Sequence, residues 1–243
     1  MRMLTLAKRN TKEILRDPLN LAFGLGFPLV LILLLSAIQA NIPVELFEIE
    51  RLAPGVSVFG LSFMTLFSAT LISKDRGSSL LQRLYTTPLT PTDFILGYTL
   101  PIIPISVAQC IICYIAAIIL GLDITVNILY ATLFIIPVSV LYIALGLLCG
   151  SVLNDKQVGG ICGALLTNLS AWVSGIWFDL ELVGGVFKRI AYALPFVHAV
   201  ELERAALSGN FGDILLHLLW VLGYAAVILV LAVLLFLRQM KRQ

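Results

Sequence analysis

Residues 214–237 read ILLHLLWVLGYAAVILVLAVLLFL and contain no Asp, Glu, Lys or Arg. A helix needs roughly 20 apolar residues to cross the hydrocarbon core of a bilayer, and this run is long enough. The sequence contains six such charge-free runs, including this one. They lie between Asp17 and Glu45, Arg51 and Lys74, Asp93 and Asp123, Asp123 and Asp155, Lys156 and Asp179, and Asp213 and Arg238. None alternates at period two, as barrel strands do. The pattern predicts an all-α polytopic membrane protein with six transmembrane helices in a single transmembrane domain, residues 1–243.

The composition supports the same class. Hydrophobic residues make up 60% of the chain and charged residues 12%, whereas a soluble domain has roughly 25% charged residues. A chain of 243 residues cannot bury this much apolar surface in water. These proportions exclude a soluble enzyme and a disordered protein, and a net charge of +2 is too small to indicate a nucleic-acid partner.

Lys and Arg residues are distributed unequally between the two sides of the predicted membrane domain. Twelve lie before the first span, after the second and fourth spans, and in the C-terminal tail; four lie on the other side, namely Arg51, Lys188, Arg189 and Arg204. Because cytoplasmic loops carry the excess of basic residues, both termini are predicted to be cytoplasmic. The first apolar run is longer than that of a signal peptide, so we interpret it as an uncleaved span.

Residues 1–17 are predicted to form an amphipathic helix that lies in the membrane interface and ends before Pro18. Its apolar face comprises Met3, Leu4, Ala7, Ile14 and Leu15. The adjacent face is basic and comprises Lys8, Arg9, Lys12 and Arg16. A basic topology signal without any further role is the alternative interpretation.

Two other segments are too polar to span a membrane. In the cytoplasmic segment 74–92, a short helix would place Leu80, Leu81, Leu84 and Tyr85 on one apolar face, which either docks a partner or rests on lipid. In segment 179–213, eight charges alternate with aromatic residues, and 186–194 and 197–207 read as two short helices broken by Pro195. We expect the second segment to form a re-entrant helical hairpin on the outer side.

Several kinds of chemistry are missing from the sequence. There is no Gly-x-x-x-x-Gly-Lys-Ser/Thr phosphate loop. The predicted spans contain no Asp, Glu, Lys or Arg, at least one of which ion-coupled carriers usually bury. Cys110 and Cys113 fall in the third span and are interpreted as packing residues, and His198 as a structural residue. Gly146 and Gly150 permit close helix approach within the chain or between two copies, while Pro101 and Pro104 predict a kink.

The order of these features resembles that of the membrane permeases of ABC-2 type exporters. The resemblance covers essentially the whole chain and depends on three regions. One is the basic helix that ends in Leu15-Arg16-Asp17-Pro18, and another is the re-entrant segment. The third is Lys74-Asp75-Arg76-Gly77, followed by Leu81-Gln82-Arg83-Leu84, Thr87-Pro88-Leu89 and Asp93-Phe94-Ile95-Leu96-Gly97.

The resemblance implies a transporter subunit and not an enzyme. Two permease chains, identical or different, would assemble with two cytoplasmic ABC ATPase subunits in a bacterial or archaeal cell membrane. The permease would bind no cofactor, and ATP and Mg would belong to the partner ATPase. The residues matching the family's coupling region are Asp75, Arg76, Leu81, Arg83 and Leu84.

The expected cargo is an amphipathic or lipophilic compound such as a drug, antibiotic or peptide. A pathway between the first, second and fifth spans would be lined by Phe63, Phe67, Asn168 and Trp172. An exporter of polysaccharide or lipid-linked glycan is an alternative within the family. Outside it, an ATP-independent carrier and a membrane enzyme using Asp179, Glu181, Glu201 or Glu203 also stay open.

Overall fold

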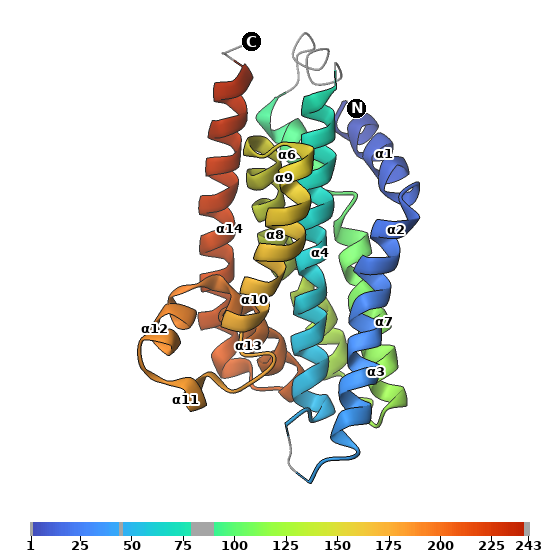
Figure 1. The fold of residues 1–243 in the computed structure, drawn as a ribbon, viewed down its shortest axis with the longest axis vertical. Coiled ribbons are helices and arrows are strands. Elements are labelled where there is room, and N and C mark those ends of the chain that lie inside the picture. The colour runs from blue at the N-terminus through green and yellow to red at the C-terminus, as the bar shows by residue number, and fades with distance from the viewer. Residues whose placement is uncertain (1, 44–45, 79–89, 241–243) are drawn as a thin grey trace.

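The computed structural model describes residues 2–43, 46–78 and 90–240. These residues form helices and connecting segments without a strand, and the long helices run side by side in an elongated bundle (Figure 1). Helix α1 and the last turns of α14 lie at the same end, here called the terminal end (Figure 1). The opposite end is called the far end. The prediction of an all-α protein is confirmed.

The helices have the following bounds. The first half of the chain comprises α1 (Arg2–Leu15), α2 (Pro18–Leu21), the π-helix η1 (Ala22–Gly26), α3 (Phe27–Gln39), α4 (Ile49–Gly77), α6 (Pro91–Thr99) and α7 (Ile103–Ile119). The second half comprises α8 (Asn127–Val152), α9 (Asp155–Val158), the π-helix η2 (Gly159–Leu166), α10 (Thr167–Val173), α11 (Leu180–Val183), α12 (Gly185–Ala193), α13 (Pro195–Ser208) and α14 (Phe211–Met240).

Five helical stretches among the described residues are long and apolar enough to cross a membrane. They are Pro18–Gln39, Ile49–Gly77, Thr92–Ile119, Asn127–Val152 and Phe211–Phe236. Each matches one of the predicted spans. The predicted fifth span is helical from Asp155 to Val173 but is not among the five, so the count of six is not confirmed.

Helix α4 is the axis of the bundle. Within its most apolar window 89% of the residues are buried, against 22% in α14. Helix α8 packs closely against α4 because Gly146 and Gly150 carry no side chain: a Cβ would lie 2.4 Å from Thr65 O at Gly146 and 2.7 Å from Ala69 O at Gly150. Across the same contact, Thr65 Oγ1 donates a hydrogen bond to Tyr142 O at 2.7 Å. This glycine pair therefore serves helix packing within the chain.

The third predicted span is interrupted, as its prolines predict. Helix α6 ends at Thr99 and α7 begins at Ile103, so Pro101 lies in the break and Pro104 in the first turn of α7. Proline has no N–H to donate to the preceding turn, and this explains the break.

The far end contains the two short helices predicted around Pro195, namely α12 and α13. Helix α13 packs against α14, α8 and α4, and most of its side chains are buried. Arg204 Nη2 donates to Gly175 O at 3.0 Å and so ties α13 to the turn after α10. Two helices in this segment are confirmed, while their re-entrant position in a membrane is not.

The structure buries only part of the predicted apolar face of α1, including Ile14, in the bundle. Leu4 and Leu15 are each 61% exposed, whereas Leu6 and the polar Asn10 are buried. The prediction grouped apolar side chains alone, but Asn10 is buried because its amide has a hydrogen-bond partner on α6.

The structure also places two acidic side chains in the interior of the bundle, although the predicted spans contain none. Glu203 belongs to no predicted span, yet α13 carries it into the bundle with no exposed surface. Asp75, in the last turns of α4, is 2% exposed. Both carboxyl groups are placed by tertiary packing, which a run of hydropathy values does not record.

The contact between α4 and α8 generates a stability prediction. We expect Gly146→Ala to lower the free energy of unfolding by about 1–3 kcal/mol, because the added methyl group meets the backbone of α4. Thermal unfolding of the purified chain in mild detergent measures the change. Gly223→Ala is the matched control, since its Cβ meets no atom within 4 Å. Equal stability of the two variants would contradict the close approach.

Candidate functional site

The candidate coupling site lies at the terminal end, where α4 approaches the undescribed residues 79–89. Asp75 lies in the last turns of α4, and its side chain is 3% exposed. Complete burial of a carboxylate is costly unless a cation or several hydrogen bonds stabilise it. The neighbouring helices supply both.

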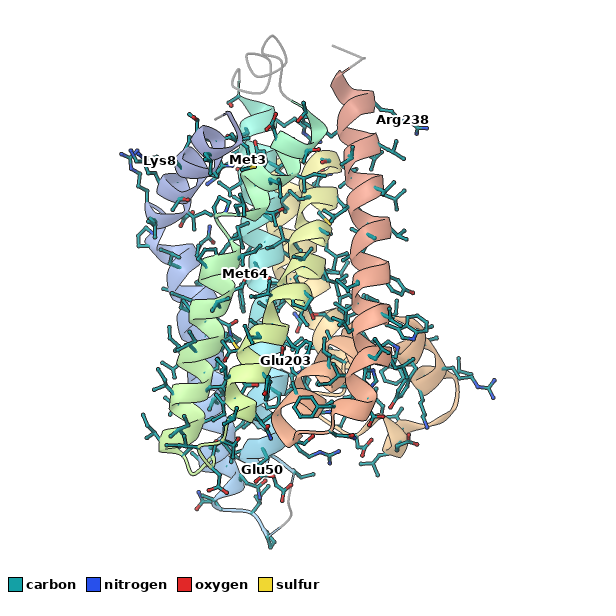
Figure 2. All side chains as sticks on the ribbon, turned by 180° about the vertical axis from the view of Figure 1, so that it is seen from behind. Met3, Lys8, Glu50, Met64, Glu203 and Arg238 are labelled. Atoms are coloured by element: carbon teal, nitrogen blue, oxygen red, sulfur yellow. The ribbon has the colours of Figure 1, made fainter. Side chains whose placement is uncertain are left out.

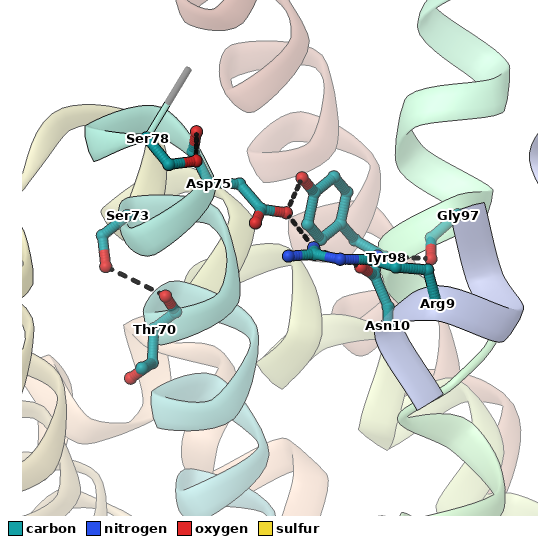
Figure 3. Close-up of polar contacts among 8 residues, drawn as sticks. All are labelled: Arg9, Asn10, Thr70, Ser73, Asp75, Ser78, Gly97 and Tyr98. Carbon is teal, nitrogen blue, oxygen red and sulfur yellow. Dashed lines mark hydrogen bonds and ion pairs between the residues drawn. The ribbon is translucent and has the colours of Figure 1, made fainter. Parts of the chain in front are cut away.

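Two side chains converge on the same oxygen of Asp75 (Figure 3). Arg9 Nη1 of α1 lies 2.5 Å from Asp75 Oδ2, and Tyr98 of α6 donates its hydroxyl to that oxygen at 2.6 Å. Hydrogen bonds to a charged acceptor are roughly twice as strong as neutral ones. Asp75 therefore joins α1, α4 and α6.

The charge pair also acts on the basic partner. Partial burial lowers the pKa of the Arg9 guanidinium, but the hydrogen bond and the charge of Asp75 raise it more, so this pKa lies above its ordinary value. Arg9 is therefore charged at every physiological pH.

A second contact fixes α1 on α6. Asn10 Nδ2 donates to Gly97 O at 3.0 Å (Figure 3), and Leu6 packs directly on Gly97. A Cβ at residue 97 would lie 2.5 Å from Leu6 Cδ2. Glycine at this position therefore allows α1 to dock closely enough for Arg9 to reach Asp75.

Arg76 connects α4 with the end of α8. Its guanidinium donates to Ser151 O and Leu153 O, which are carbonyl groups at the C-terminus of α8. The last carbonyls of a helix have no partner within the helix and carry partial negative charge, so a cation stabilises them. Arg76 thereby ties the end of α4 to the end of α8.

Stacked aromatic rings extend the same assembly to α14. The rings of Phe94 and Phe236 are stacked with centroids 3.7 Å apart, and Phe94 lies 4.9 Å from Tyr98. We call Arg9, Asp75, Arg76 and Tyr98 the terminal cluster. The cluster joins α4, shortly before the undescribed residues 79–89, to α1, α6 and α8.

The structure places two of the five predicted coupling residues. Asp75 and Arg76 belong to the terminal cluster, while Leu81, Arg83 and Leu84 lie outside the described residues. Neither the role of Tyr98 nor the pairing of Arg9 with Asp75 was predicted from the sequence. One local signal was present, because Asn10 interrupts the apolar face of α1 and indicates a polar contact there.

The predicted pathway residues do not share one surface. Phe63 and Phe67 are buried, and Phe63 lies 5.7 Å from Phe27 of α3 between ring centroids. Asn168 is exposed and donates to Ala164 O at 2.8 Å, and Trp172 is 56% exposed. Helix α3 and the π-helix η1 thus cover the two phenylalanines, while α10 presents the other two residues outward.

The described residues contain no group of three or more His, Cys, Asp and Glu side chains placed to bind a metal ion. Cys110 and Cys113 are buried in α7. His198 interacts with its neighbours through both ring nitrogens, at 3.0 Å from Tyr192 O and 2.9 Å from Nδ1 of His217.

Comparison with known proteins identifies one family. The family profile described as "ABC-2 type transporter" matches residues 1–208. The match includes the whole terminal cluster and continues to the last residue of α13. No curated protein matches the chain.

Substitutions in the terminal cluster are expected to destabilise the fold, and their effects should depend on one another. We expect Arg9→Gln to lower the free energy of unfolding by about 1–3 kcal/mol, because it leaves a buried carboxylate with a weaker partner. Lys8→Gln on the exposed face of the same helix is the control and should change it by less than about 0.5 kcal/mol.

A double-mutant cycle with Asp75→Asn tests the pairing itself. The combined variant should lose less stability than the sum of the two single variants, measured by thermal unfolding in detergent. Strict additivity would show that the two side chains do not interact.

Proposed function

The chain belongs to the ABC-2 type transporter family, and we propose that it exports an amphipathic or lipophilic compound across a bacterial or archaeal cell membrane. It is a multi-pass permease subunit that has no nucleotide-binding motif, binds no cofactor and works with a separate ATPase. The direction of transport and the class of cargo are the proposed parts.

The terminal cluster is the observation that supports a coupling role for this end. A permease that uses ATP hydrolysed elsewhere needs a rigid connection between the ATPase and its spans. The buried Arg9–Asp75 pair and the Arg76 contact provide such a connection at the beginning of segment 74–92. We propose that this segment docks on the ATPase through Leu81, Arg83 and Leu84, and that Asp75 and Arg76 pass its displacement to the bundle.

The proposed topology has six spans, with both termini cytoplasmic. Helices α9, η2 and α10 follow one another without a break from Asp155 to Val173. At 1.5 Å per residue this segment is about 28 Å long, close to the roughly 30 Å of a hydrocarbon core. A sixth crossing also agrees with the position of α1 and the end of α14 at one end of the bundle (Figure 1).

The remaining segments have proposed positions relative to the membrane. Residues 1–17 lie in the cytoplasmic interface, where exposed Leu4 and Leu15 face lipid while Leu6 faces the bundle. Residues 179–213 form the outer re-entrant segment. All of these belong to one transmembrane domain, residues 1–243.

A second permease chain, identical or different, completes the proposed transporter. The first and fifth spans contain π-helices, which are frequent at functional sites, and Gly159 and Gly160 face open space. We propose that the two chains meet along these spans. The cargo path would then use exposed Asn168 and Trp172, and would reach Phe63 and Phe67 when α3 moves away from α4.

Co-purification tests the partnership with an ATPase. We expect an ATP-hydrolysing subunit to be recovered with the chain from its native membrane in equal amount. The double substitution Arg83→Ala with Leu84→Ala should reduce this recovery at least about tenfold, since it removes a charge and an apolar anchor from the docking segment.

Arg189→Ala, in the segment proposed to lie outside, is the matched control and should keep full recovery. Wild-type chain recovered alone, from membranes in which the candidate ATPases are detected, would overturn the proposal and favour an ATP-independent carrier.

Labelling of introduced cysteines tests the topology. A membrane-impermeant thiol reagent added to intact cells should label Lys188→Cys, whereas Arg238→Cys should react only after permeabilisation. Background labelling should be low because three of the four native cysteines are buried and the fourth, Cys149, is partly buried. Labelling of both variants in intact cells would refute a cytoplasmic C-terminus.

A further inference from the structure

Glu203 is an acidic residue inside the helix bundle. Its exposed fraction is 0%, and it lies within the bundle between Met64, near the middle, and Glu50, at the far end (Figure 2). Glu203 belongs to helix α13, which packs inside the bundle although it is not one of the predicted spans. Ionisable groups at such depth are rare because an unpaired charge in an apolar interior is costly, and they commonly have a function.

The partners of Glu203 do not stabilise a carboxylate charge. Tyr114 donates its hydroxyl to Glu203 Oε2 at 3.4 Å, a long hydrogen bond, and Glu203 Oε1 has no partner within the described part of the chain. The adjacent Arg204 turns the other way, since Nη1 binds Glu201 Oε1 at 2.8 Å and Nη2 binds Gly175 O.

The groups around Glu203 are uncharged. The titratable side chains that face it, Tyr114 and Cys110, both come from α7, and no cation of the described residues acts on it from α4, α8 or α14. Complete burial raises the pKa of Glu203, and the Tyr114 hydrogen bond opposes this effect more weakly. In this conformation burial therefore favours the protonated, neutral form of the carboxyl group.

Helix α13 separates Glu203 from an open cavity. A cavity of about 540 Å³ at the far end is lined by α13 residues that include Glu201, Arg204 and Ala205. At 100° per residue, Glu201 and Ala205 lie about 160° from Glu203 around the helix axis, whereas Leu207, which also lines the cavity, lies only about 40° from it. Separation of α13 from Tyr114 of α7 would open the carboxyl group towards this cavity.

We propose that Glu203 is a proton-binding site that is coupled to the movement of α13. While α13 is packed, the carboxyl group holds its proton; when α13 separates, the O–H bond breaks, the proton passes to water in the far-end cavity and the carboxylate remains. Repacking takes up one proton. Assigning this water to the outer side depends on the proposed function, whereas the protonation itself does not.

The pKa of Glu203 in the packed and open states determines how the opening of α13 depends on pH. The pKa of Glu203 is raised in the packed state and ordinary in the open, hydrated state, so rising pH favours opening. Between these two pKa values, the ratio of open to packed chains increases about tenfold per pH unit, because opening releases one proton.

Two measurements on the purified chain in lipid vesicles test the proposal. Infrared spectroscopy should detect the carbonyl band of a protonated carboxyl group, which Glu203→Gln removes and Glu181→Gln retains; Glu181 is the exposed control of the same segment. Amide hydrogen exchange of α13 should rise with pH relative to Glu203→Gln, by up to about tenfold per unit, whereas Glu181→Gln should follow the wild type.

The two measurements separate the possible failures. A wild-type chain without the carbonyl band, or an exchange ratio independent of pH, would overturn the proposal. If Glu203→Gln does not fold, Tyr114→Phe replaces it and should shift the band by removing the hydrogen bond; an unshifted band would equally contradict the assignment. Neither measurement requires an ATPase. Both results therefore hold even if the proposed coupling to an ATPase is wrong.

Discussion

The carboxylate of Asp75 is the group on which the terminal end of the molecule depends. It is almost completely buried at the end of the central helix, and a buried carboxylate is stable only with a counter-charge and hydrogen bonds. Arg9 and Tyr98 supply these from helices that precede and follow α4 in the chain. The requirements of one ionised group thereby determine how α1 and α6 lie against α4.

Polar contacts and small residues also organise the rest of the bundle. In a membrane, apolar surface gains little by moving from lipid to protein, so packing and hydrogen bonds between helices specify the arrangement. The contact of α4 with α8 has this character, because two glycines allow close approach and Thr65 bonds to the backbone of Tyr142. Arg76 continues the contact to the last carbonyls of α8. Helix α4 thus contacts its neighbours at several positions along its length.

The two buried carboxyl groups illustrate different solutions to the same physical problem. Asp75 lies against a cation and a hydroxyl group, whereas Glu203 lacks a cation among the described residues, and its burial raises its pKa. The first solution makes a permanent connection that suits the transmission of force. The second leaves a group whose charge depends on access to water, which suits a conformational step.

The sequence alone determined the class of the protein, most of its spans, the break at Pro101 and the pair of short helices around Pro195. These features depend on hydropathy and on backbone chemistry, and both are properties of neighbouring residues. It did not determine which face of α1 is buried, that Asp75 pairs with Arg9 across 66 positions, or that Glu203 enters the bundle and meets Tyr114 across 89 positions. These points depend on long-range packing, because a buried polar group is stabilised by partners distant in the chain, and no local pattern records which distant segment will supply them.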